Sequence, residues 1–231
     1  MASASSERSR GRCSNPRCDP VPIVYVETNY LIGLTLGQEP DGEPLLQAAE
    51  EWRGLELAIP TICFMEAAAT IRARVKDWKA LYERLVRERK ELERNAVSES
   101  SRRLLDPFLE ASVVSLIYID GLTMDFRQAV RRLGSIATLI PMSREAIGHG
   151  FSDLLVPDRR YPDLVLPDNL ILHCILDHAK NHPGTAKAFL SGNRSEFGRT
   201  EAREALRSSG IDKDFTDAKN ARGWVRSRPV P

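Results

Sequence analysis

The sequence is poor in the features that mark several common protein classes. Its four cysteines are too few for a disulfide-stabilised scaffold of 231 residues. A formal net charge of +1 favours neither a general nucleic-acid binder nor a membrane-surface protein. No unbroken apolar run approaches the roughly 20 residues that cross a bilayer, and no apolar stretch follows the basic N-terminus as in a secretory signal. We therefore expect a cytoplasmic protein with no membrane partner.

Several enzyme motifs are also missing. The chain has no GxGxxG, P-loop or GxSxG motif, so nucleotide hydrolysis by those routes and serine-hydrolase chemistry have no support. Its four histidines form neither HExxH nor a zinc-ligand spacing. Cys13 and Cys18 are a single pair, with no second pair at the distance that a zinc site needs.

What the sequence does contain is an alternation of short apolar runs with helical patterns. We expect a disordered tail over residues 1–20, which are rich in Ser, Arg, Pro and Gly, and one domain over 21–231. The alternation predicts an α/β fold with a parallel, doubly wound sheet, because parallel neighbours need crossover connections. The expected strands are 22–26, 55–59, 137–142, 187–191 and 211–215, and the expected helices are 30–36, 44–53, 143–155, 167–180 and 200–209.

A long charged segment interrupts this alternation. Apolar residues from Ile71 to Leu85 are spaced by four and three residues, which places them on one helical face. Their expected partner is 102–133, which Pro107 and Gly121 should divide. We interpret 72–133 as a helical hairpin inserted in the α/β core. It could form a homodimer or bind a partner protein.

Four acidic residues stand at or just after the expected strand ends. Glu27 follows the first strand, Glu66 lies one turn into the helix after the second, Asp168 opens the helix at 167–180, and Glu196 follows the fourth strand. Each alone could be a helix cap, a turn residue or a surface charge. Together they would meet where ligands bind in parallel sheets. Hard carboxylate ligands without His or Cys favour Mg²⁺ or Mn²⁺.

These four stretches resemble the motifs of PIN-domain ribonucleases. The segments VYVETNYLIGL, IPTICFMEAAATI, LPDNLILHCILDHA and FLSGNRSEF occur in the order and spacing of that family. The resemblance covers about residues 22–217, apart from the insertion. It implies a three-layer α/β/α fold around a central parallel sheet of four to five strands.

The resemblance also implies an activity and roles for residues. Glu27, Glu66, Asp168 and Glu196 would bind one or two Mg²⁺ or Mn²⁺ ions, and a metal-bound water would cut RNA, leaving a 5′-phosphate. Asn29 would cap the first helix, while Thr28 and Asn193 would support the site or contact substrate. The basic residues that could contact phosphates, or could simply be solvated, are Arg72, Arg74, Lys76, Lys79 and Arg194. Such an enzyme could be the toxin of a toxin–antitoxin pair, with an antitoxin-like partner, or an RNA-processing nuclease.

Two residues depart from the family pattern. Glu27 stands where the family nearly always has Asp, and the fourth acid is lengthened to Glu196. One methylene moves a carboxylate by about 1.5 Å, which is large beside metal–oxygen distances of roughly 2 Å. The alternative is therefore a catalytically weakened PIN-like module that binds RNA or a protein without cutting. A phosphotransfer domain is a third candidate, but it needs an Asp at a strand end, which Glu27 does not supply.

Overall fold

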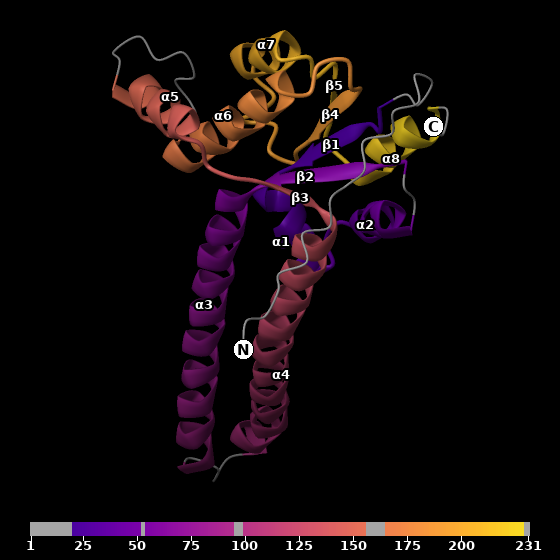
Figure 1. Ribbon diagram of the computed structural model, residues 1–231. Helices are drawn as coiled ribbons and strands as arrows, with labels where there is room; N and C mark the ends of the chain where they lie inside the picture. Colours follow the sequence, from indigo (N-terminus) through magenta and orange to yellow (C-terminus); the bar gives the residue numbers. More distant parts are fainter. Residues whose placement is uncertain (1–19, 52–53, 95–98, 156–164, 229–231) are drawn as a thin grey trace, which may run out of the picture.

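One parallel sheet forms the centre of the molecule. The computed structural model describes residues 20–51, 54–94, 99–155 and 165–228. In this part of the chain five strands are ordered β3-β2-β1-β4-β5, all parallel (Figure 1). They are β1 (Ile23–Val26), β2 (Glu56–Pro60), β3 (Thr138–Ile140), β4 (Lys187–Leu190) and β5 (Lys213–Phe215). The expected disordered tail, with Cys13 and Cys18, lies outside the described residues.

Strand β1 is the central strand, and its sequence shows why. All four of its residues are buried, with Val24 paired to Leu57 of β2 on one side and Ala188 of β4 on the other. A strand covered on both faces needs apolar side chains at every position, rather than at alternate positions. The uninterrupted run IVYV satisfies that requirement.

Helices cover both faces of the sheet, which gives three α/β/α layers. The helices α5, α6 and α7 lie over one face, and α1, α2 and α8 lie over the other (Figure 1). The bounds of these helices are α1 (Thr28–Leu36), α2 (Gly42–Glu51), α5 (Arg144–Leu155), α6 (Leu166–Lys180), α7 (Thr200–Ser208) and α8 (Ala218–Arg226). The predicted fold class is confirmed.

Two long helices form the inserted hairpin, which projects away from the sheet (Figure 1). They are α3 (Thr61–Arg94) and α4 (Glu99–Ile136), and they pack against each other along their length. Ile71 is buried, and the rings of Trp78 and Tyr118 meet with centroids 4.6 Å apart. The apolar face predicted on α3 therefore faces α4.

The prediction that Pro107 and Gly121 divide the second helix is wrong. Helix α4 runs through both residues. Pro107 is exposed, so water can bind the carbonyl that loses its intrahelical partner. Packing against α3 offsets the weak helix propensity of Gly121.

Helix α4 is also more apolar than a search for unbroken runs indicated. An 18-residue window within Arg103–Ile136 is long and apolar enough to cross a membrane by length and composition, and only 22% of that window is buried. Glu110 and Asp120 interrupt this stretch in the sequence, so it contains no unbroken apolar run of that length. Much of the apolar surface of α4 is therefore exposed to solvent.

One helix was not predicted from the sequence. Helix α8 begins after Asp217, whose carboxylate accepts the Asn220 backbone N–H at 2.8 Å. The helix packs against α2, β4 and β5, and Trp224 lies against Phe215. An Asp before a helical pattern is the signal that could have located it.

Candidate active site

The four predicted carboxylates line one pocket at the carboxyl end of the sheet. Glu27, Glu66, Asp168 and Glu196 come from four separate segments and surround a cavity of about 510 Å³. Thr28, Asn29 and Asn193 line the same cavity. The chain thus brings together all the acids that the sequence singled out.

Glu27 occupies the most buried position of the four acids. It is 2% exposed, and its Oε2 accepts the backbone N–H of Asn29 at 2.8 Å. Glu27, and not Asn29, is therefore the N-cap of α1, and the prediction for Asn29 is wrong. The Glu27 carboxylate thus lies at the first turn of α1, where the helix dipole favours negative charge.

The other oxygen of Glu27 is buried without a hydrogen-bond partner. Burial, with a smaller contribution from nearby Glu66 and Glu196, raises the pKa of Glu27 to about 7, although the Asn29 N–H and the Ser191 hydroxyl oppose the shift. A buried carboxylate oxygen with no partner is costly. This oxygen is a candidate cation ligand, since Glu27 lines the cavity.

Glu66 is positioned by the start of α3. It is partly exposed and accepts a hydrogen bond from the Thr28 hydroxyl, which joins the first turns of α1 and α3. The neighbouring Cys63 and Ala67 are buried and fix the helix against the sheet. Glu66 consequently faces the cavity from a well-packed helix.

Asp168 lies in the first turn of α6, where Pro167 helps to start the helix. Its side chain is 8% exposed. Burial raises its pKa well above the usual range, and the nearby charges of Glu196 and Glu66 raise it further. Asp168 is thus held next to other acids, an arrangement that a cation would stabilise.

Glu196 is held by a tight turn after β4. The Asn193 amide donates to the Glu196 carboxylate, and the Phe197 N–H donates to the Asn193 carbonyl at 3.1 Å. Phe197 is buried edge-on against Phe189 of β4. The Asn-x-x-Glu-Phe spacing therefore serves a structural purpose: it orients Asn193 and Glu196 together.

Gly198 closes this turn, and we expect the Gly198→Ala protein to be less stable by about 1–3 kcal/mol. A Cβ at this position would lie 2.3 Å from the Arg194 carbonyl oxygen, so the backbone must shift. Chemical denaturation measures the loss. Gly192→Ala is the matched control, because a Cβ there meets nothing within 4 Å. Equal stability of the two variants would contradict the role assigned to the turn.

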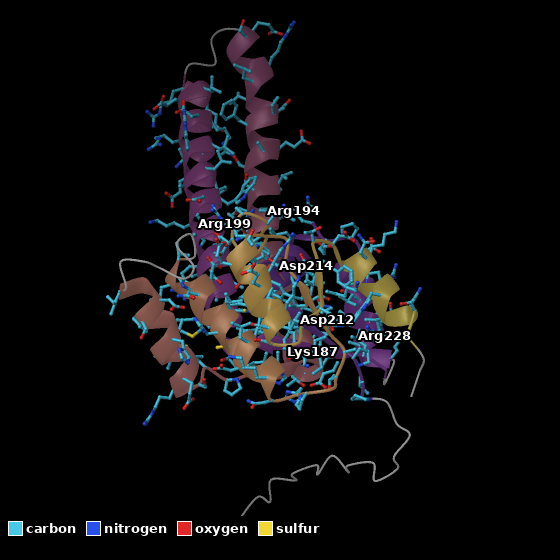
Figure 2. All side chains as sticks on the ribbon, turned by 90° about the horizontal axis from the view of Figure 1, so that it is seen from above. Lys187, Arg194, Arg199, Asp212, Asp214 and Arg228 are labelled. Atoms are coloured by element: carbon cyan, nitrogen blue, oxygen red, sulfur yellow. The ribbon has the colours of Figure 1, made fainter. Side chains whose placement is uncertain are left out.

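The candidate phosphate contacts divide into two groups. Arg74 lines the cavity, one helical turn beyond Thr70. Arg72, Lys76 and Lys79 are exposed on another face of α3, and they do not line it. Arg194 is exposed and donates to the Thr216 hydroxyl at 2.9 Å. Figure 2 places Arg194 and Arg199 toward the end of the domain from which the hairpin projects, and Lys187 and Asp212 toward the opposite end.

Several residues of the site were not predicted from the sequence, among them Thr70, Glu39 and Ser191. Thr70 and Glu39 line the cavity, and the Ser191 hydroxyl bonds to Glu27. Thr70 could have been found, since it lies four residues after Glu66 on the same helix. Glu39 lies in the loop between α1 and α2, whose course the sequence pattern did not predict. Its carboxylate also accepts the Ala218 backbone N–H.

The donor set fits a hard divalent cation, and its carboxylates line one cavity. In the described ranges, no three His, Cys, Asp or Glu side chains are placed to hold a metal ion together. Glu27, Glu66 and Glu196 each bond to a neighbouring N–H or hydroxyl group instead.

Comparison with known proteins identifies the part of the chain that contains this site. A family model for the PIN domain matches residues 24–197, which include all four acids. A search of curated proteins finds no match.

Proposed function

The chain belongs to the PIN-domain family, and on that basis we propose that it is a metal-dependent endoribonuclease that hydrolyses RNA phosphodiester bonds. The observation that carries the proposal is the convergence of four carboxylates, from four segments, on one cavity. The family assignment supports a nuclease-like module in general. The metal dependence and the RNA substrate are the parts that we propose.

Glu27, Glu66, Asp168 and Glu196 would hold Mg²⁺ or Mn²⁺. Such an ion orients a phosphodiester and lowers the pKa of an attacking water. The residues around it have distinct tasks. Asn29 and Ser191 bond to Glu27, Thr28 bonds to Glu66, and Asn193 bonds to Glu196, so each of these carboxylates has a fixed direction. Such supporting hydrogen bonds set the position of ligands.

Substrate binding falls to the bases and amides at the rim. Among the described residues that line the cavity, Arg74 is the basic one, so it is placed to bind a phosphate next to the acids. Arg194, on the loop after β4, could bind a second phosphate along the strand. Without these bases, the acidic cavity would repel a polyanion.

The experiment is cleavage of a mixed RNA pool with Mn²⁺, comparing the wild type with Glu66→Gln. We expect the wild type to cut and the Gln variant to be at least about 100-fold slower, because it loses a charged ligand. Equal products from both proteins would reject this active site. A few cleavage positions would indicate a selective toxin, and many would indicate a processing nuclease.

A specific observation favours the second candidate, a PIN-like module that binds without cutting. The lengthened Glu27 is engaged in capping α1, which an Asp at a metal site need not do. Thermal unfolding with millimolar Mn²⁺ separates the candidates. A rise in Tm that Glu66→Gln abolishes supports the nuclease, and no rise supports the binding module.

A further inference from the structure

Helix α4 has two apolar faces, and only one of them has a partner in the described structure. The face against α3 includes Ser112, Ser115, Ile119 and Leu122, all at most 5% exposed. Half a turn away, large side chains are open to solvent. They are Leu109 at 47%, Val113 at 49%, Leu116 at 43%, Ile117 at 67% and Met124 at 62%. We call this set the outer face of α4.

The outer face is a continuous stripe. Val113, Ile117, Asp120 and Met124 follow one another at intervals of four, three and four residues, the spacing of a helix–helix seam. Its five apolar side chains expose on the order of 500 Å² together, which is at the upper end of what monomers leave uncovered. Twice that area approaches the size of a standard interface.

The charges at the two ends of the stripe say which partner fits. Asp106 and Glu110 are exposed near the tip of the hairpin, and Arg127 and Arg131 are exposed on the same side of α4 near the domain. Asp106 with Arg131, and Glu110 with Arg127, have the same midpoint in the sequence, between Tyr118 and Ile119. That midpoint falls within the apolar stretch.

An antiparallel copy of the same helix, centred there, would set each acidic end beside a basic end. It would also set Val113 opposite Met124 of the other copy. A two-fold interface must be self-complementary, and this stripe is so in the charges at its two ends and in the contact of Val113 with Met124, while Ile117 lies opposite Asp120 of the other copy. A parallel arrangement would place like charges together.

We propose that the outer face of α4 is a homodimer interface, in which two hairpins pair antiparallel to form a four-helix bundle. The hairpins extend away from the sheets, and in this register two copies pair over residues 106–131, centred midway along α4 (Figure 1). The interface is separate from the acidic cavity, and so it does not depend on the proposed nuclease activity.

Sedimentation equilibrium of the full chain, over a range of concentrations, tests the proposal. We expect a dimer for the wild type and an affinity at least about 30-fold weaker for Ile117→Glu, since a central apolar contact would be replaced by a charge. Leu81→Glu is the matched control, because Leu81 is a 42% exposed apolar residue on α3, outside the outer face. Ile117 is itself exposed, so circular dichroism should show both variants folded.

Charge exchange tests the antiparallel register. Changing Asp106 and Glu110 to Arg should weaken the dimer, and so should changing Arg127 and Arg131 to Glu. The protein with all four changes should regain the wild-type affinity, because its ends are complementary again. Failure of this rescue would overturn the antiparallel arrangement.

The effect of replacing Asp120 distinguishes a homodimer from a complex with a basic partner protein. It lies in the centre of the stripe, so the two copies would bring two like charges near each other. Asp120→Asn should therefore tighten the dimer several-fold. A wild-type protein that is monomeric at 100 µM would overturn the proposal. So would a monomeric wild type that floats with phosphatidylglycerol vesicles while Ile117→Glu does not, since the outer face would then bind lipid.

Discussion

A Glu27→Gln protein is expected to be more stable than the wild type at pH 8 in the absence of divalent metal, by about 2–3 kcal/mol. Glu27 is buried with one oxygen unpaired, and its pKa in the folded protein is about 7. Glutamine can still accept the Asn29 N–H to cap α1, but it carries no charge. Urea denaturation with EDTA measures the difference.

The pH dependence follows from the raised pKa. A folded-state pKa above the unfolded value means that the folded protein binds the extra proton. The stability linked to that proton is fully present below about pH 4.5, the ordinary value, and is lost as the pH rises through about 7. The advantage of Glu27→Gln should consequently shrink toward pH 5.

Two controls make this result specific. Glu204→Gln, at an exposed acid on α7 that does not line the cavity, should change stability little at either pH. Millimolar Mn²⁺ should raise the Tm of the wild type at pH 8 and leave that of Glu27→Gln nearly unchanged, because the cation needs the charged ligand. An equal advantage of Glu27→Gln at pH 5 and pH 8 would contradict the electrostatic explanation.

Replacing Asp168 by Asn is expected to reduce Mn²⁺-dependent RNA cleavage by about 100-fold or more. Asp168 lies in the first turn of α6 beside Glu196 and Glu66, and Asn preserves its shape while removing its charge. Initial rates on a labelled RNA, at saturating Mn²⁺, give the loss. Thermal unfolding should show that the variant folds, since removing a crowded acid also removes repulsion.

The same Glu204→Gln protein serves as the control for cleavage. It removes one acid from the chain and leaves the cavity intact, so its rate should equal that of the wild type. A rate for Asp168→Asn within about threefold of the wild type would mean that the cavity is not the place of reaction.

The α/β core was predictable because its local signals agree with its tertiary structure. The run IVYV can satisfy its apolar side chains only when covered on both faces, and crossover helices follow from parallel pairing. The order of acids after strand ends likewise placed Glu27, Glu66, Asp168 and Glu196 in one pocket. The sequence pattern and the topology of a parallel sheet therefore leave few possible arrangements of the strands and of these acids.

The remaining features depend on contacts that no local pattern contains. Helix α4 continues through Pro107 since α3 supports it, and α1 starts at Glu27 because that side chain accepts the Asn29 N–H. The detailed direction of each carboxylate depends on partners such as Ser191 and Thr28. Propensity and periodicity do not determine such partners.

The length of α3 has a mechanical consequence. Glu66 and Arg94 belong to one uninterrupted helix, and the rise per residue separates them by about 40 Å. A stiff rod of this kind cannot change its tilt at one end alone. Whatever anchors the distal end of the rod therefore also constrains the angle at which it presents the Glu66 carboxylate to the acids on the sheet.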